Sequence, residues 1–433
     1  MRSRSIGITL ATVAGLIGVA GSSATAAPPD CTVPGDYPTI QAAINDPACE
    51  TITVAPGQFN ENLSINRQLT LDGAGSGASP ASDTIVMSVL PTTPVVNITA
   101  GGASAGDRLV LSDLRLTGAL GAGGNADSGV RLHIGASGFT TFDNITSTAN
   151  TGNGIAIDQS AGSTVTDVEV TGSDLSVNGN SGFRVPTRVT LDGLDVSDTH
   201  FDGNLSTGLT MFGNLLNATI DGSTFNENGG HPAANAGIGI SAHGFDTQVN
   251  TVDNLAITGS EANRNTGTHP TTNVSTGIQF SSRSGDQFSD ITIVDTEMNE
   301  NGRHGLRLEV LDGALPAVLD DVTVRDNQIL RNGEAGITSF SPPGAPTNVH
   351  INLNNIYGNG VGIANTSTGH FDAECNWWGH ATGPAAADNT NGMGDAVVVA
   401  NGGTVDFRPW SPRLIGRGQN PEASCNIGAH GNP

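Results

Sequence analysis

One motif recurs along the middle of this 433-residue sequence and restricts the folds open to it. It consists of an apolar residue, two variable residues, Asn, three variable residues, Gly, and then an apolar, a variable and an apolar residue. Clear copies are LSVNGNSGFRV (175–185), FDGNLSTGLTM (201–211), MNENGRHGLRL (298–308) and ILRNGEAGITS (329–339). Successive motif glycines are 26 to 40 residues apart, and they are Gly154, Gly182, Gly208, Gly237, Gly277, Gly305 and Gly336. A repeat of this length, with its insertions HPAANA and HPTTNVS at one fixed place, is typical of a solenoid.

Each copy follows a short run in which β-branched and polar residues alternate, which predicts a strand rather than a helix. A strand, a turn, a second short strand, a corner at the Asn and a strand that starts at the Gly would make one turn of a parallel β-helix. We expect the Gly to supply a positive φ at the corner, and the Asn side chains to hydrogen-bond from rung to rung.

The apolar residues after each Gly should point inward and form a continuous core. The inward residues expected are Val130/Leu132, Ile155/Ile157, Phe183/Val185, Leu209/Met211, Ile238/Ile240, Ile278/Phe280 and Leu306/Leu308. The pattern therefore predicts an all-β fold, a parallel β-helix solenoid.

The two ends of such a stack expose strand edges that need to be covered. At the start, Ile40, Ala43 and Ile44 share one face of a short predicted helix, and Pro38 suits its first turn. Near the end, CNWWGHATGP (375–384) follows the last repeat, and its two tryptophans are large enough to cover an open apolar stack. This position favours a C-terminal lid over a thiol–imidazole site. We divide the chain into a signal peptide (1–26), an N-terminal cap with the short helix (27–51), the parallel β-helix (52–370), and a C-terminal cap and tail (371–433).

The first residues predict export from the cell. A short basic start, an apolar stretch and a small-residue ATA sequence are typical of a secretory signal peptide, cleaved here near Ala26. The alternative is a membrane anchor, but the apolar stretch is short and rich in Gly, Ala and Ser. We therefore expect a secreted, extracellular or periplasmic protein with no membrane span after signal removal.

Four cysteines in an exported chain favour disulfide bonds. Their spacing permits closure within each end of the chain, as Cys31–Cys49 and Cys375–Cys425. A metal site would need closer, CxxC-type spacing.

All 17 basic residues are Arg, and 41 acidic residues bring the formal net charge to −24. An acidic surface of this kind repels nucleic acid and anionic membranes, so no nucleic-acid partner is expected. It also opposes tight electrostatic capture of polyuronic acids unless cations intervene. The lack of Lys fits both a salt-adapted surface and a GC-rich genome.

Segments at both ends of the mature chain are similar to a known superfamily. YPTIQAAIN and ITVAPGQFNENLSINRQLTLDGAG near the start, and NWWGHATGP and GMGDAVVVANGGTVDFRPW near the end, resemble segments of secreted proteins of the pectate-lyase-like superfamily. The resemblance runs from about Tyr37 to Trp410. It implies a right-handed parallel β-helix of PbH1-type repeats. It implies no single activity, because this superfamily contains lyases, esterases, glycosidases, epimerases and adhesins.

Motifs of several enzyme branches of that superfamily are absent from the sequence. There is no GFxDFIFG-like stretch of a pectin methylesterase, no RIK motif of a polygalacturonase and no DPHE motif of a mannuronan epimerase. These absences lower the expectation of an enzyme.

Outward positions supply a catalytic candidate from the residues alone. Arg131, His133, Asp158 and Arg184 fall on neighbouring rungs, which stack roughly 4.8 Å apart, so they could share one face. An Arg or His base beside an acidic, Ca²⁺-binding residue is suited to β-elimination from a uronate. The alternative is a solvated polar face.

Two further groups of residues are candidates for binding. A second cluster, with the same alternative, contains Arg303, His304, Arg307 and Glu309. Glu169 and Asp195 fall at equivalent places in successive rungs, and paired carboxylates favour a hard cation such as Ca²⁺. For this pair the alternative is an acidic patch exposed to solvent.

These observations predict an exported β-helix protein with a structural or surface-interaction role, adhesin-like and contacting a carbohydrate or matrix. The alternative is a polysaccharide-active enzyme, in the first place a Ca²⁺-assisted uronate polysaccharide lyase, so enzymatic activity stays open. The middle rungs contain no Trp, and no Tyr before Tyr357. A carbohydrate groove there would depend on polar groups.

Overall fold

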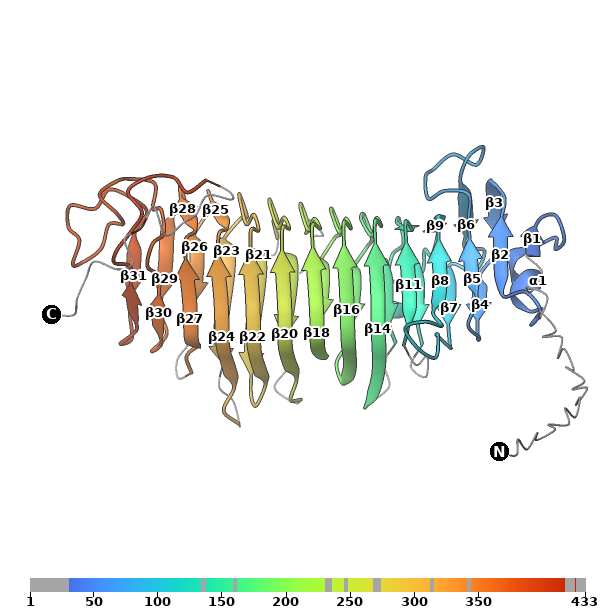
Figure 1. Ribbon diagram of the computed structural model, residues 1–433, viewed down its shortest axis with the longest axis horizontal. Helices are drawn as coiled ribbons and strands as arrows, with labels where there is room; N and C mark the ends of the chain where they lie inside the picture. The colour runs from blue at the N-terminus through green and yellow to red at the C-terminus, as the bar shows by residue number, and fades with distance from the viewer. Residues whose placement is uncertain are drawn as a thin grey trace, which may run out of the picture.

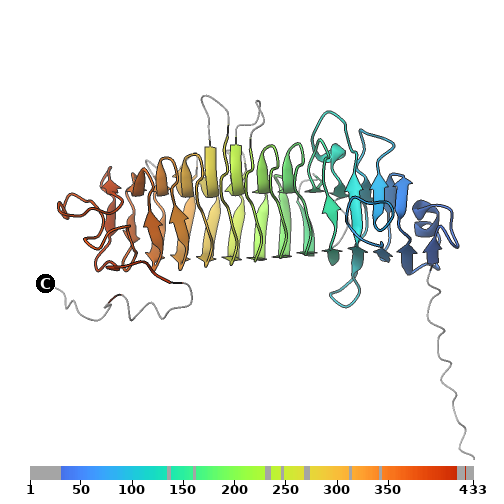
Figure 2. The same cartoon turned by 90° about the horizontal axis from the view of Figure 1, so that it is seen from above.

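A computed structural model describes residues 31–133, 138–158, 162–229, 236–244, 248–267, 274–311, 315–340, 344–416 and 425. The chain winds into one long stack of rungs, with its first strands at one end and its last strands at the other (Figure 1). Seen from above, the rungs follow one another in chain order along the whole axis (Figure 2). The predicted signal peptide lies outside the described residues. None of the helices in these described stretches combines the length and apolar composition that a membrane crossing needs.

The longest sheet has fourteen parallel strands. In spatial order they are β1 (Cys31–Val33), β2 (Thr51–Val54), β5 (Thr70–Asp72), β8 (Leu109–Ser112), β11 (Thr140–Asp143), β14 (Ser163–Thr171), β16 (Val189–Ser197), β18 (Asn214–Asp221), β20 (Thr251–Thr258), β22 (Gln287–Val294), β24 (Val318–Arg325), β27 (Thr347–Asn352), β30 (His370–Asp372) and β32 (Thr404–Asp406).

The second sheet has twelve parallel strands. Their order is β4 (Leu63–Ile65), β7 (Val96–Ile98), β10 (Val130–Leu132), β13 (Ile155–Ile157), β15 (Ser181–Val185), β17 (Thr207–Met211), β19 (Ala236–His243), β21 (Val274–Arg283), β23 (His304–Leu311), β26 (Ala335–Ser339), β29 (Val361–Asn365) and β31 (Val397–Val399).

A third, narrower side closes each rung. It contains a four-stranded sheet, a two-stranded sheet and single bridges between them. The strands are β3 (Gly57–Asn60), β6 (Thr84–Met87), β9 (Leu114–Thr117) and β12 (Thr146–Ser147), and then β25 (Gln328–Leu330) and β28 (Asn355–Tyr357). A 3₁₀ turn spans Asn125–Asp127. The winding is right-handed, as expected where parallel strands of one sheet are joined by crossovers.

The predicted apolar core is confirmed. Every side chain of the expected inward pairs is buried, and none is more than 4% exposed. One pair was assigned to the wrong register. Leu209 of β17 faces Ile240, and Met211 faces Ala242, so the inward pair of β19 is Ile240/Ala242 and the equivalent glycine is Gly239, not Gly237. The error is two residues, because GIGIS offers two glycines on the same face of the strand.

The expected role of the motif glycines was wrong. Gly182, Gly305 and their equivalents do not have a positive φ. A Cβ atom on Gly182 would lie 2.8 Å from the carbonyl oxygen of Gly208, and one on Gly305 would lie 2.7 Å from that of Gly336. The glycines are therefore needed for close approach of neighbouring rungs. The left-handed corner is instead the residue before the motif Asn, as at Val177, with a φ of 58°.

The predicted asparagine ladder is present. Each Asn side-chain oxygen accepts a hydrogen bond from the backbone N–H of the Asn one rung earlier, as between Asn228 and Asn265 (2.9 Å) and between Asn265 and Asn301 (3.0 Å). The column is Asn150, Asn178, Asn204, Asn228, Asn265, Asn301, Asn332 and Asn359, and it ends on the carboxylate of Asp395. Because these amides are enclosed, their hydrogen bonds fix the register of one rung on the next.

At the N-terminal end, the helix α1 (Ile40–Ile44) contacts β1, β2 and β4. It begins after Thr39, whose hydroxyl accepts from the N–H of Ala42 (3.1 Å), so Pro38 precedes the helix and does not lie in its first turn. The carboxylate of Glu61 accepts from the N–H groups of Ile40 and Gln41, both at 3.0 Å. Both predicted disulfides are present.

The sheets continue beyond the predicted solenoid range of 52–370 at both ends. Cys31–Val33 already pairs with β2, and β31 and β32 pair with β29 and β30. In the CNWW segment, Trp378 is fully buried in the core, whereas Trp377 is partly exposed. Asn376 accepts from the N–H of Asn354 (2.8 Å), which makes this segment another rung. After this segment, β31 and β32 add one further strand to each of the two long sheets.

Candidate functional site

The sequence-predicted cationic residues lie on the outward side of the 12-stranded sheet, here called the outer face. One column of this face contains Arg131, Ala156, Arg184, Thr210, Ser241, Gln279, Arg307 and Thr338, each in register with the next. The neighbouring column includes His243, Ser281 and Glu309. Since rungs stack in strict register, residues far apart in sequence form a continuous strip along the axis.

At its N-terminal part, the outer face brings three of the four predicted catalytic residues together. A guanidinium nitrogen of Arg131 lies 2.5 Å from Oδ2 of Asp158, and Nε2 of His133 lies 3.3 Å from the same oxygen. Arg184 does not join this group. Its guanidinium lies over the ring of Phe212, 5.3 Å from the centroid. The Asp158 carboxylate is thus neutralised by Arg131.

The second predicted cluster also forms, and it includes one residue that the sequence analysis missed. Arg303 donates two hydrogen bonds to Glu334, at 2.7 and 2.8 Å. Arg307 pairs with Glu309, which is 2% exposed and also accepts from the hydroxyl of Ser281 (3.0 Å). Glu334 could have been found from the repeat, because it lies two residues before its motif glycine, as Arg303 does.

Three buried polar atoms beside this cluster have no hydrogen-bond partner in the described part of the chain. They are Nδ1 of His304, Oε1 of Gln279 and Oγ1 of Thr276. Their residues are 7%, 5% and 0% exposed. Buried polar groups in proteins are nearly always hydrogen-bonded, so these three atoms on adjacent strands need a partner other than the described side chains, such as water or a polar ligand.

The electrostatics of this cluster keep His304 neutral. Burial, and then the positive charges of Arg303 and Arg307, lower the pKa of His304 from 6.5 to about 4 against the opposing effect of Glu334. The imidazole is therefore uncharged at neutral pH. A shallow pocket of about 230 Å³ opens here, lined by Arg303, His304, Arg307, Glu334, Thr338, Phe340 and Thr366. It is smaller than the roughly 300 Å³ at which typical small-molecule pockets begin, so it suits one unit of a longer chain.

The predicted calcium residues lie on the outward side of the other, 14-stranded sheet. Glu169 and Asp195 are in register on adjacent strands, as expected. However, a guanidinium nitrogen of Arg108 lies 3.2 Å from Glu169 and 2.9 Å from Asp167. Burial, and then the carboxylates of Glu169, Asp167 and Asp221, raise the pKa of Asp195. Within the described stretches, no group of three or more His, Cys, Asp or Glu side chains is arranged to hold a metal ion. The calcium site at Glu169 and Asp195 stays a prediction. One of these two carboxylates, Glu169, is paired with Arg108.

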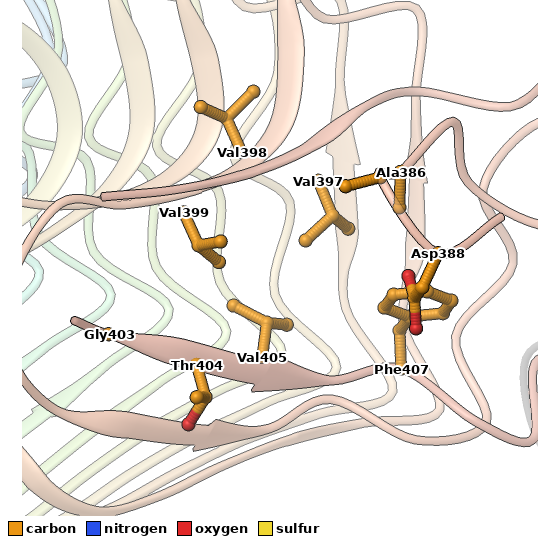
Figure 3. Close-up of a pocket in the computed structure, with 10 residues that line it drawn as sticks. Ala386, Asp388, Val397, Val398, Val399, Gly403, Thr404, Val405 and Phe407 are labelled. Carbon is orange, nitrogen blue, oxygen red and sulfur yellow. The ribbon is translucent and has the colours of Figure 1, made fainter. Parts of the chain in front are cut away.

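Two further hollows lie near the C-terminal end. One, of about 520 Å³, is on the 14-stranded sheet, where Nδ1 of His350 lies 3.0 Å from Asp372. The other, of about 440 Å³, is an open hollow between the last strands, lined by Val397, Val399 and Val405 with Phe407 to one side (Figure 3). Apart from Asp388 its lining has no charged group, so it offers little for chemistry.

Comparison with known proteins supports the fold. No protein-family model matches the chain, and no curated protein matches it. Among solved structures, the A-module of mannuronan C-5 epimerase AlgE4 from Azotobacter vinelandii is 16% identical with a TM-score of 0.53, covering 85% of this chain and 92% of that one. The catalytic domain of a GH87 alpha-1,3-glucanase, in a complex with nigerose, is 12% identical with a TM-score of 0.51, covering 84% of this chain and 65% of that one. The protein is thus a right-handed parallel β-helix, a class defined here by fold alone.

Proposed function

We propose that this protein is an exported member of the pectate-lyase-like superfamily whose outer face contacts a polysaccharide, in a structural or surface-interaction role. The observation that carries the proposal is the group of unsatisfied polar atoms on His304, Gln279 and Thr276 beside the small pocket. Sugar hydroxyl groups both donate and accept hydrogen bonds, so they suit these polar groups once a side-chain shift exposes them, since each atom is enclosed in the unliganded protein. The epimerase and the glucanase described above are named for polysaccharide substrates, which agrees with this proposal.

The shape of the outer face supports an extended ligand. The register columns run along the solenoid axis with about 4.8 Å per rung, so a polymer chain lying on them meets a new set of side chains at each rung. A pocket that takes one unit and a strip that takes its neighbours suit a polymer better than a single sugar. Export is supported by the two disulfide bonds, which form in oxidising compartments.

The test is equilibrium binding of the protein to a panel of neutral and acidic polysaccharides. We expect at least one to bind, with affinity lowered about tenfold or more in Gln279→Ala and in His304→Ala, because each change removes a hydrogen-bonding group. Thr292→Ala is the matched control, since Thr292 points outward from β22 of the other sheet. Binding to no polysaccharide, or equal loss in the control, would contradict the proposal.

A second candidate function is polysaccharide cleavage, and the state of His304 favours it. Its imidazole is neutral and so has a lone pair that can take a proton, although the lowered pKa makes it a weak base, and the cations of Arg303 and Arg307 stabilise negative charge that develops on the substrate. The proposed reaction class is β-elimination from a uronate, with or without Ca²⁺. It is checked by the absorbance of unsaturated products over a panel of polyuronates. If His304→Gln forms no product while Arg131→Ala still does, His304 is the base. If the unmodified protein forms no product from any polyuronate, it is not a lyase of this class.

A further inference from the structure

Among the residues that the structure describes, Arg184 has no counter-ion. In the described part of the chain its guanidinium makes neither a hydrogen bond nor an ion pair, and its Nε atom is enclosed. Its neighbours in the register column are Ala156 and Thr210, which carry no charge. Burial lowers the pKa of Arg184, yet a guanidinium stays protonated at any physiological pH, so the cost of burying the charge is not relieved by losing a proton.

Phe212 contacts only one face of the Arg184 guanidinium. Its ring covers one face of the guanidinium at 5.3 Å, and the ring of His243 meets Phe212 edge-on, with centroids 6.3 Å apart. A cation–π contact leaves the N–H groups in the guanidinium plane unused. Those groups form a planar fork that matches a carboxylate or a sulfate.

We infer that Arg184 and Phe212 form a subsite for a sugar unit that carries an anionic group, a carboxylate or a sulfate ester. The inference rests on the proposed function and adds to it the chemical class of the polysaccharide. The subsite lies four rungs from Arg307, which is about 19 Å along the axis. The column residues between the two places, Thr210, Ser241 and Gln279, are 3%, 5% and 5% exposed, so a chain that reaches both must pass over them.

The net charge of −24 does not oppose this assignment at close range. At physiological salt, charges more than about 8 Å away are largely screened, so the guanidinium at the contact decides the local preference. Arg131, two rungs away, and Asp158, one rung away, neutralise each other. The attraction comes from a single well-placed cation and not from a basic surface.

The experiment compares two pairs of polymers that differ in charge: polygalacturonate with its methyl ester, and dextran sulfate with dextran. Dissociation constants are measured for the unmodified protein, Arg184→Met and Arg188→Gln. Arg184→Met keeps an apolar stem over Phe212 but removes the charge, and Arg188 is an exposed control four residues away. We expect the unmodified protein to favour one acidic member over its neutral partner by about tenfold or more, and Arg184→Met to abolish that ratio.

The two pairs identify the anion, since a preference in the first pair means a carboxylate and in the second a sulfate. Thermal melting checks the fold, and Arg184→Met should melt at the same or a higher temperature because it removes a half-buried charge that has no counter-ion among the described residues. The inference would be overturned if Arg184→Met still preferred the acidic polymer over its neutral partner. It would also be overturned if the unmodified protein showed no such preference. If neutral polymers bind and His304→Ala still weakens them, the proposed function survives that result; binding of none of the four would overturn both.

Discussion

Val177 adopts a backbone conformation that a β-branched side chain rarely tolerates. Its φ is 58°, and its side chain is 63% exposed, so packing contributes little to holding it there. It occupies the corner before Asn178, where other rungs place Gly203 or Glu227 in the same left-handed region. The ladder hydrogen bonds of Asn178 on either side impose the conformation on Val177.

Replacing Val177 by Gly should therefore stabilise the protein. The left-handed conformation costs a non-glycine residue roughly 1–2 kcal/mol, more than the backbone entropy that Gly adds to the unfolded state. The measurement is the melting temperature, which should rise. Leu205→Gly is the control, because Leu205 is also exposed but has no positive φ, and it should melt lower.

His304 predicts a pH dependence of stability. Its pKa is about 4 in the folded protein and 6.5 in the unfolded chain. Above pH 6.5 the residue is neutral in both states and has no effect. As the pH falls from 6.5 to 4, the unfolded chain binds a proton that the folded protein does not, so stability is lost, by up to about 3 kcal/mol.

The check is the melting temperature of the unmodified protein and of His304→Gln between pH 7 and pH 4. Burial raises the pKa of Asp202, Asp286 and Asp395, which gives the opposite trend with pH in both proteins. The difference between the two proteins isolates His304. It should shift in favour of the Gln variant as the pH falls, and a constant difference would contradict the assignment.

At the scale of the strands, the column of motif glycines sets how closely rungs approach. A Cβ atom on Gly305 would meet the Gly336 carbonyl oxygen and a methyl group of Ile329, both at 2.7 Å. We expect Gly305→Ala to destabilise the protein by about 1–3 kcal/mol, because neither neighbour is free to move. Gly106→Ala is the control, since nothing lies within 4 Å of its added Cβ atom and its φ is not positive. Equal melting of the two variants would contradict this role.

The strands show how far the sequence alone could reach. The inward residues were predictable because alternation within a strand and repetition between rungs both point to the same side chains. The register of β19 was not predictable, because two glycines two residues apart satisfy the same pattern. The left-handed corner at Val177 was not predictable either, because the asparagine ladder imposes a conformation that Val itself disfavours.

The candidate site was predictable only in part. The positions of Arg131, Arg184 and Arg307 in one column followed from the repeat. Their partners did not, because an ion pair such as Arg108–Glu169 depends on side-chain conformation across rungs. The lack of hydrogen-bond partners at Gln279 and Thr276 could not be predicted from a single sequence, since both residue types are common on exposed strands.

At the scale of the whole molecule, stability should be divided along the axis. Each rung contacts mainly its two neighbours, so the ends can open while the middle stays folded. The disulfides close chain segments of 18 and 50 residues, one at each end. Loop entropy gives them about 3 and 4 kcal/mol of stabilisation respectively.

We expect Cys31→Ser with Cys49→Ser to lower hydrogen-exchange protection in β1, β2 and α1, while β16 to β22 keep theirs. Cys375→Ser with Cys425→Ser should affect β29 to β32 in the same local way. Exchange measured by mass spectrometry on peptides checks both. Loss of protection along the whole stack in either variant would show a single cooperative unit instead.

The unequal rungs have a consequence for how such a chain can change. The step from Gly208 to Gly239 takes 31 residues and the step from Gly239 to Gly277 takes 38, yet both keep every strand in register. Extra residues are therefore tolerated between the corner Asn and the strand that follows it. New loops grafted at this junction would alter what the outer face recognises while leaving the scaffold intact, so one solenoid can acquire different specificities by insertion alone.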